Sequence, residues 1–160
     1  MRHLLSALLG GSLLAIAQVM LLPRWSPIGF VPDLLLLAVV LKGFGRADSR
    51  TIWLGLVVGL AQGWLHGTAW WAFALSRTFA AWLAGWLRVR WLWLSAPASG
   101  FCAAVTTLAA EAMLALLLTV SERSGTPLAL WLVIAPFEAL VNAMLGTLVF
   151  WFCRPKEVLA

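Results

Sequence analysis

Residues 53–67 read WLGLVVGLAQGWLHG, an apolar stretch in which glycine recurs at every fourth position. In an α-helix, residues four apart lie on one face, so these glycines form a flat ridge that a second helix can approach closely. Close backbone approach drives helix association in lipid, where apolar burial between helices gains little. The stretch therefore predicts a transmembrane helix with a packing ridge formed by Gly55, Gly59, Gly63 and Gly67. We expect the partner to be another helix of this chain, with a second protein as the alternative.

The chain as a whole is too apolar for a soluble globule. Of its 160 residues, 63% are hydrophobic and 11% are charged, whereas about a quarter of the residues in a soluble domain are charged. Apolar runs bounded by charge, Pro or Gly predict helices at residues 4–22, 32–44, 51–66, 69–87, 96–120 and 128–152. We therefore predict an all-α polytopic membrane protein, a bundle of six transmembrane helices that forms a single transmembrane domain over residues 1–160.

The first apolar run imitates a secretory signal peptide, since Arg2 precedes it and the small residues Ala15 and Ala17 lie within it. However, the run continues to Leu22 and so reaches membrane-spanning length. We expect it to be retained as the first helix.

The basic residues of the chain predict its orientation. One side of the predicted bundle carries Arg2, Lys42, Arg46, Arg50, Arg88, Arg90, Arg154 and Lys156. Because cytoplasmic loops hold the excess of Lys and Arg, both termini and the loops around Arg46 and Arg90 are predicted to be cytoplasmic. The loops around Arg24, Gly67 and Arg123 are predicted to face outward. Basic residues at the ends of apolar runs mark orientation, so we expect no nucleic-acid binding.

Four strongly polar residues, Arg77, Glu111, Glu138 and Asn142, fall inside the predicted spans. A charge at the bilayer centre costs about 2.5 to 3.5 kcal/mol on insertion scales, so these residues should face the bundle interior and pair. A rise of about 1.5 Å per residue places the three charged ones at one depth in the outer half. Asn142 shares a helix face with Glu138, and Thr107 shares one with Glu111. We predict that Arg77 contacts Glu111 or Glu138.

This polar cluster has two interpretations, an internal clamp that fixes the helix arrangement or a pathway for a ligand or ion. Gln18, Gln62 and His66 are expected to form hydrogen bonds between helices, and Cys102 and Cys153 to be buried thiols. The sequence holds no nucleophile elbow, no phosphate-cradling loop and no metal-ligand spacing. We therefore predict no catalytic residue, no metal site and no cofactor, and expect that the chain is not an enzyme.

Four features together resemble the MreD family, a small polytopic protein of the bacterial rod-shape system, the elongasome. They are Val31-Pro32-Asp33-Leu34 opening a short helix after an outer loop, the basic loop Lys42–Arg50, the segment GLVVGLAQGWLHG (55–67) running into ALSRTFAAWLAGWLRVR (74–90), and a last helix with Pro136, Asn142 and Phe150. Their order, their spacing and the total length agree with the family. One departure is that Gly63, followed by Trp71, stands where the family often has an acidic residue, so a role tied to that acid does not carry over.

The resemblance implies a non-enzymatic component of the bacterial cytoplasmic (inner) membrane that works in cell shape and peptidoglycan synthesis. The implied partners are MreC, bound directly, and RodA, a penicillin-binding transpeptidase and MreB in a larger assembly, all in a setting of membrane lipid.

Two alternatives stay open. A six-helix bundle with an outward polar cluster is also similar to the substrate-capture component of energy-coupling-factor transporters, and a shared fold would not decide function. A translocator of protons or of a lipid-linked precursor would need a labile pair between Arg77 and Glu111. A small molecule held near Arg77, or a single-span protein that co-purifies, would distinguish these functions.

Overall fold

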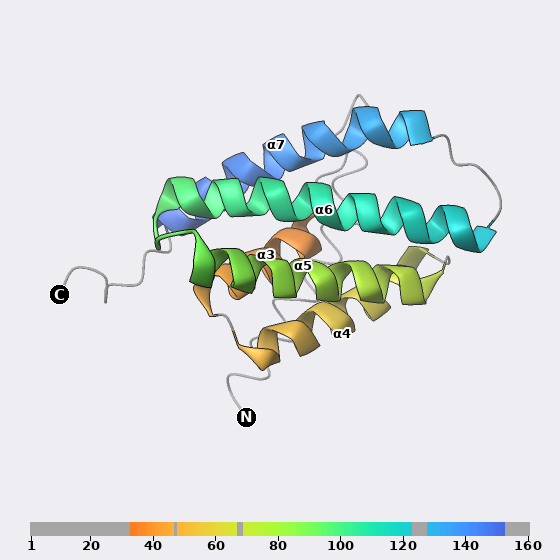
Figure 1. Ribbon diagram of the computed structural model, residues 1–160, viewed down its shortest axis with the longest axis horizontal. Coiled ribbons are helices and arrows are strands. Elements are labelled where there is room, and N and C mark those ends of the chain that lie inside the picture. Colours follow the sequence, from red (N-terminus) through yellow and green to blue (C-terminus); the bar gives the residue numbers. More distant parts are fainter. Residues whose placement is uncertain (1–32, 47, 67–68, 123–127, 153–160) are drawn as a thin grey trace.

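The computed structural model describes residues 33–46, 48–66, 69–122 and 128–152, in which every regular element is an α-helix (Figure 1). The helices are α3 (Leu34–Gly45), α4 (Ser49–His66), α5 (Trp70–Arg90), α6 (Ala96–Glu122) and α7 (Leu128–Phe152). Their ends agree within three residues with the predicted ranges that begin at residue 32. The predictions for residues 4–22, Gln18, Arg24, Pro32, Gly67, Arg123, Cys153 and both termini lie outside the described residues.

Helix α3 is short because polar residues bound it at both ends. Asp33 caps its start, where Oδ1 accepts a hydrogen bond of 2.8 Å from the backbone N–H of Leu36. The chain leaves the helix at Arg46, whose backbone is extended. Twelve residues give a length of about 18 Å, well short of a bilayer core of about 30 Å. One end of α3 must therefore lie inside any bundle that spans a membrane.

Helices α4 and α5 pack antiparallel along the glycine ridge. A Cβ atom added at Gly59 would lie 2.5 Å from the backbone oxygen of Phe73, and one added at Gly63 would lie 2.5 Å from the Cα atom of Trp70. At Gly55, the nearest atom is the backbone oxygen of Arg77, at 2.6 Å. The ridge therefore contacts a helix of the same chain, as predicted, and its described positions admit only glycine.

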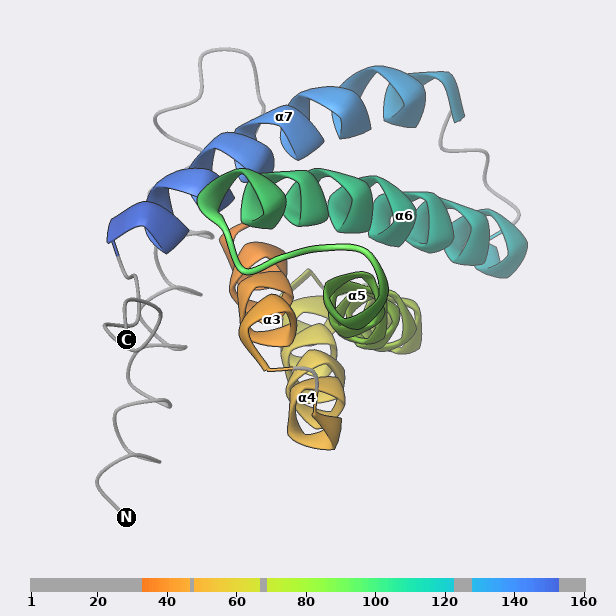
Figure 2. The ribbon, with the colours of Figure 1, turned by 60° about the vertical axis from the view of Figure 1, so that its left-hand side comes forward.

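A second antiparallel pair consists of α6 and α7, which also meet at glycines. A Cβ atom at Gly100 would lie 2.8 Å from the backbone oxygen of Ala143, and one at Gly146 would lie 3.1 Å from Cβ of Ala103. Figures 1 and 2 show α6 and α7 side by side in one layer, with α3, α4 and α5 grouped on one side of it. Phe44 of α3 is fully buried in the apolar core between these layers.

Around an apolar core, the structure also buries several polar side chains and exposes many large apolar ones, which is unusual for a water-soluble protein. Arg77 is the largest of the fully buried side chains, and Asn142 has no exposed surface. By contrast, Trp64 is 83% exposed and Phe152 is 75% exposed. Among the described residues, two helical segments, Ala96–Ser121 and Val133–Phe152, are long and apolar enough to cross a membrane.

Candidate functional site

Arg77 is the centre of a polar cluster that joins four helices. Its Nη2 atom lies 2.5 Å from Oδ2 of Asp33, and its Nη1 atom lies 2.9 Å from Oε1 of Glu111. Its Nε atom donates a hydrogen bond of 2.9 Å to Oε1 of Gln62. The side chain, which starts from α5, is thus tied to the start of α3, to α4 and to α6. The predicted contact between Arg77 and Glu111 is present.

The guanidinium group suits this position because it carries five N–H donors in a rigid planar fork and stays charged. Nη1 of Arg77 also lies 3.3 Å from Oγ of Ser76, so all three of its nitrogens have acceptors within the described residues. A buried ion pair gains little over a well-packed apolar contact, but loss of one partner leaves an uncompensated charge. The cluster therefore locks the arrangement of the helices more than it adds stability.

Asp33 is the acidic partner that the sequence did not reveal, since it had been singled out only as part of the family motif. Its Oδ2 atom also accepts a hydrogen bond of 2.7 Å from Nε2 of Gln62, while Oδ1 caps α3. The short length of α3 explains why a capping residue lies at the depth of Arg77. Gln62 forms hydrogen bonds between helices, as predicted.

Glu138 of α7 completes an acidic group. One carboxylate oxygen each from Asp33, Glu111 and Glu138 lie within 4.8 Å of one another. Glu138 accepts a hydrogen bond from the backbone N–H of Asp33, and its charge interacts with that of Arg77 at a distance longer than an ion pair. Three carboxyl groups therefore face one guanidinium. Within the part of the chain that the structure describes, these three carboxyl groups could ligate a metal cation. However, two of them already form ion pairs with Arg77, whose positive charge repels a second cation.

Asn142 lies one helical turn from Glu138 and makes a polar contact between α7 and α6. Its Nδ2 atom donates a hydrogen bond of 3.1 Å to Oγ1 of Thr107, and both residues are fully buried. The predicted meeting of the polar faces of these two helices is thus present.

Other residues that the sequence singled out lie away from this cluster. His66 contacts the backbone oxygen of Gln62 at 2.8 Å through Nδ1, and its ring stacks on Phe73. Pro136 lies inside α7 with its side chain exposed. Cys102 is buried, and its Sγ atom lies 3.9 Å from the backbone oxygen of Ala84. His66 and Cys102 therefore make local packing contacts, whereas Pro136 is exposed.

The chain matches no family model, no curated protein and no solved structure. Its function must therefore be inferred from its own residues.

Proposed function

We propose that the chain is a multi-pass protein of the bacterial cytoplasmic membrane, with six transmembrane helices and both termini in the cytoplasm. The observation that carries the membrane placement is a buried arginine in a bundle with many exposed large apolar side chains: Arg77 is 2% exposed, while Trp64 is 83% exposed. Charged residues inside a membrane bundle turn to its interior, and apolar residues face lipid. The two long apolar helices agree with this placement, and the bias of basic residues supports the orientation.

Within this membrane, the chain serves as a non-enzymatic scaffold of the cell-wall elongation complex, in the manner of the MreD family. The resemblance of its motifs supports this role, and the site is compatible with it. Arg77 binds Asp33, and Asn142 binds Thr107, so two residues of the family motif hold helices together. Buried polar side chains that bind neighbouring helices in this way suit a component that holds other proteins rather than one that transforms a substrate.

The proposed direct partner is MreC, through which the chain would help couple MreB filaments to RodA and a penicillin-binding transpeptidase. A single-span partner needs an apolar face, and α7 offers one. Phe137 is 62% exposed and Leu140 is 59% exposed on this helix. An exposed apolar helix face fits either lipid or another transmembrane helix.

Solute capture, the rival function, receives less support from the cluster. A solute that bound at Arg77 would have to displace Asp33, Gln62 and Glu111 from the three nitrogens of the guanidinium group. Each displaced carboxylate would then be left in the bundle without its cation, which is costly.

Affinity purification of the tagged full-length chain from mild detergent tests the proposal. We expect MreC to co-purify at a fixed ratio, and Arg90→Gln, which alters an exposed residue, to leave that ratio unchanged. Purification of the chain without MreC but with a stoichiometric small molecule would refute the scaffold role and favour solute capture. Reporter fusions should also place the C-terminus in the cytoplasm.

A further inference from the structure

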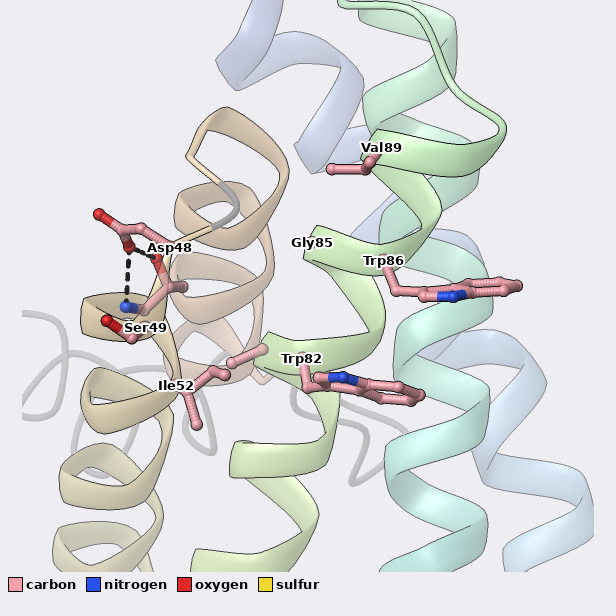
Figure 3. Close-up of a pocket in the computed structure, with 9 residues that line it drawn as sticks. Asp48, Ser49, Ile52, Trp82, Gly85, Trp86 and Val89 are labelled. Atoms are coloured by element: carbon pink, nitrogen blue, oxygen red, sulfur yellow. Dashed lines mark hydrogen bonds between the residues drawn. The ribbon is translucent and has the colours of Figure 1, made fainter.

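A groove opens between α4 and α5 at the end opposite to the polar cluster. It has a volume of about 360 Å³, and its walls include Ile52 and Ser49 on α4 and Trp82, Trp86 and Val89 on α5. Figure 3 shows Ser49 and Ile52 on one side, with Val89 extending toward them from α5. This volume lies within the range of small-ligand sites, about 300 to 1,000 Å³.

The groove forms because the glycine ridge ends. Four residues before Gly55, the same helix face carries Thr51 in place of glycine. The two helices then spread apart toward the start of α4, as both overall views show (Figures 1 and 2). The buried methyl group of Thr51 packs toward α3, where a Cβ atom at Gly43 would lie 3.5 Å away.

Next to the groove, the end of α5 carries a basic residue. A second hollow is lined by Trp86, Trp91 and Arg90, so Trp86 belongs to both. Arg90 ends the helix, and Trp86 and Trp82 lie one and two turns before it, about 6 and 12 Å along the axis. The two indole rings stack with centroids 6.5 Å apart. Aromatic residues next to basic ones are typical of the headgroup level of a membrane.

The charges near the groove are mostly positive. Asp48 is part of the lining, but its carboxylate accepts hydrogen bonds from the backbone N–H and the hydroxyl of Thr51. Arg46 and Arg50 lie close enough to Asp48 to act on its charge, and both are exposed. Two cations therefore act on one hydrogen-bonded carboxylate, and a third, Arg90, lines the adjoining hollow. This excess of positive charge favours an anionic ligand.

From these observations, we infer that the groove binds one anionic phospholipid of the inner leaflet. Its acyl chain lies against Ile52 and Val89, and its phosphate meets Arg90. Basic pockets between helices on the cytoplasmic side suit anionic headgroups. A transmembrane partner helix fits less well, because the α5 wall from Ala81 to Val89 is about 12 Å long, against a bilayer core of about 30 Å. The inference rests on the membrane placement proposed above and not on the proposed protein partners.

Native mass spectrometry of the purified full-length chain tests the headgroup contact. The chain is mixed with phosphatidylglycerol or with phosphatidylcholine of the same acyl chains. We expect one phosphatidylglycerol to be retained preferentially, and Arg90→Gln to lower its retention about fivefold, the effect of one basic residue at an anionic surface. Lys42→Gln removes an equal charge from an exposed residue that lines neither hollow and should retain most of the binding. Equal retention of both lipids, or equal losses in both variants, would overturn the inference.

A second pair of variants tests the apolar part of the groove. Val89 is 71% exposed in the groove, and Val120 is 73% exposed near the end of α6. Val89→Trp should fill the groove and abolish selective retention of phosphatidylglycerol, whereas Val120→Trp should not. Size-exclusion profiles that match the unmodified chain establish that each variant folds, and if Val89→Trp does not fold, the Arg90 comparison decides.

A photo-crosslinker at position 89 identifies the occupant directly. A crosslink to phosphatidylglycerol supports the inference, and a crosslink to a protein helix overturns it. Selective lipid retention without co-purification of MreC would refute the proposed function and leave the groove assignment standing. Co-purification of MreC without selective lipid retention would support the proposed function and overturn the groove assignment.

Discussion

The pair formed by α4 and α5 is closed at one end and open at the other. At the closed end, Gly59 and Gly63 bring the two backbones into contact, since an added Cβ at either position would lie 2.5 Å from an atom of α5. At the open end, Thr51 occupies the corresponding position, and the groove beside Ile52 begins. A difference of one side chain per turn therefore decides whether two helices seal against each other or leave room for a ligand.

The charged residues at the two ends also differ, because those at the closed end are buried and those at the open end are exposed. At the closed end, Arg77 and Asp33 have exposed side-chain fractions of 2% and 5% and bind each other. At the open end, Arg46, Asp48 and Arg90 are exposed. Buried charges must find partners inside the protein, whereas exposed ones remain accessible to ligands. The comparison predicts that substitutions at the closed end affect folding and that those at the open end affect binding.

The largest effect is expected for Gly59→Leu at the closed end. The new side chain would have to displace the backbone of Phe73 and Ala74, because even its Cβ atom would lie 2.5 and 2.6 Å from them. Overpacking typically costs about 1 to 3 kcal/mol, and a clash with backbone belongs at or above the upper end. The yield of monodisperse protein in detergent should therefore collapse.

The matched control for this variant is Leu60→Ile, which keeps the apolar volume of the neighbouring, half-buried residue and leaves the ridge intact. Equal yields from the two variants would mean that the contact between α4 and α5 contributes nothing to folding.

The next largest effect is expected for Arg77→Ala. Removal of this side chain leaves Asp33 and Glu111 without their cation in the bundle, and breaking a buried pair typically costs about 3 to 5 kcal/mol. Thermal unfolding in detergent should detect this loss. Arg90→Ala, at an exposed residue, should change stability by less than about 0.5 kcal/mol.

A double-mutant cycle sharpens the interpretation of Arg77. Arg77→Leu combined with Glu111→Leu should cost less than the sum of the two single changes, because each single change leaves one charge unpaired. Additive costs would show that the two side chains do not act together.

A smaller effect should separate the two carboxylates that bind Arg77. Asp33 also accepts a hydrogen bond from Gln62, whereas Glu111 is more exposed, at 12%. Asp33→Asn should cost about 1.5 to 3 kcal/mol, as expected for hydrogen bonds to charged groups. Asparagine caps helices well, so the loss reports the ion pair rather than the cap.

Glu111→Gln is the matched substitution and should cost less, about 1 kcal/mol, since its amide oxygen can still accept a hydrogen bond from Arg77. Unfolding of the two variants under identical conditions gives the comparison. A larger cost for Glu111→Gln would make Glu111 the main partner of Arg77.

The helices and the closed end were largely predictable from the sequence. Charge, proline and glycine interrupt the apolar runs, so the five described helices end within three residues of their predicted limits. The spacing of Gly55, Gly59 and Gly63 predicted a close helix contact, because residues four apart share one helix face. The depth of Arg77 and Glu111 followed from the helical rise per residue.

Asp33 and the groove were not predictable in this way. Asp33 precedes a helix, and the end of a transmembrane helix is normally expected at a membrane surface. The exception is a helix too short to reach both surfaces. Helix α3 was recognised as short, but the side on which it falls short depends on how it packs against α4, α5 and α6. The groove depends on the divergence of two helices, which a pattern within one helix does not specify.

The smallest effect concerns Asp48 at the open end and appears as a dependence on pH. Hydrogen bonds from Thr51 and the positive charges of Arg50 and Arg46 hold the pKa of Asp48 below its ordinary value. A carboxyl group whose pKa is lower in the folded state stabilises that state above its unfolded pKa, about 3.9. This contribution is lost as the pH falls through the lower, folded pKa.

Thr51→Val keeps the buried methyl group but removes the hydroxyl donor, so it should unfold at a lower temperature than the unmodified chain near pH 6. The difference attributable to Asp48 should shrink below about pH 4, whereas a difference that stays constant from pH 6 to pH 3 would assign the loss to the contact between the Thr51 hydroxyl and the backbone oxygen of Arg46.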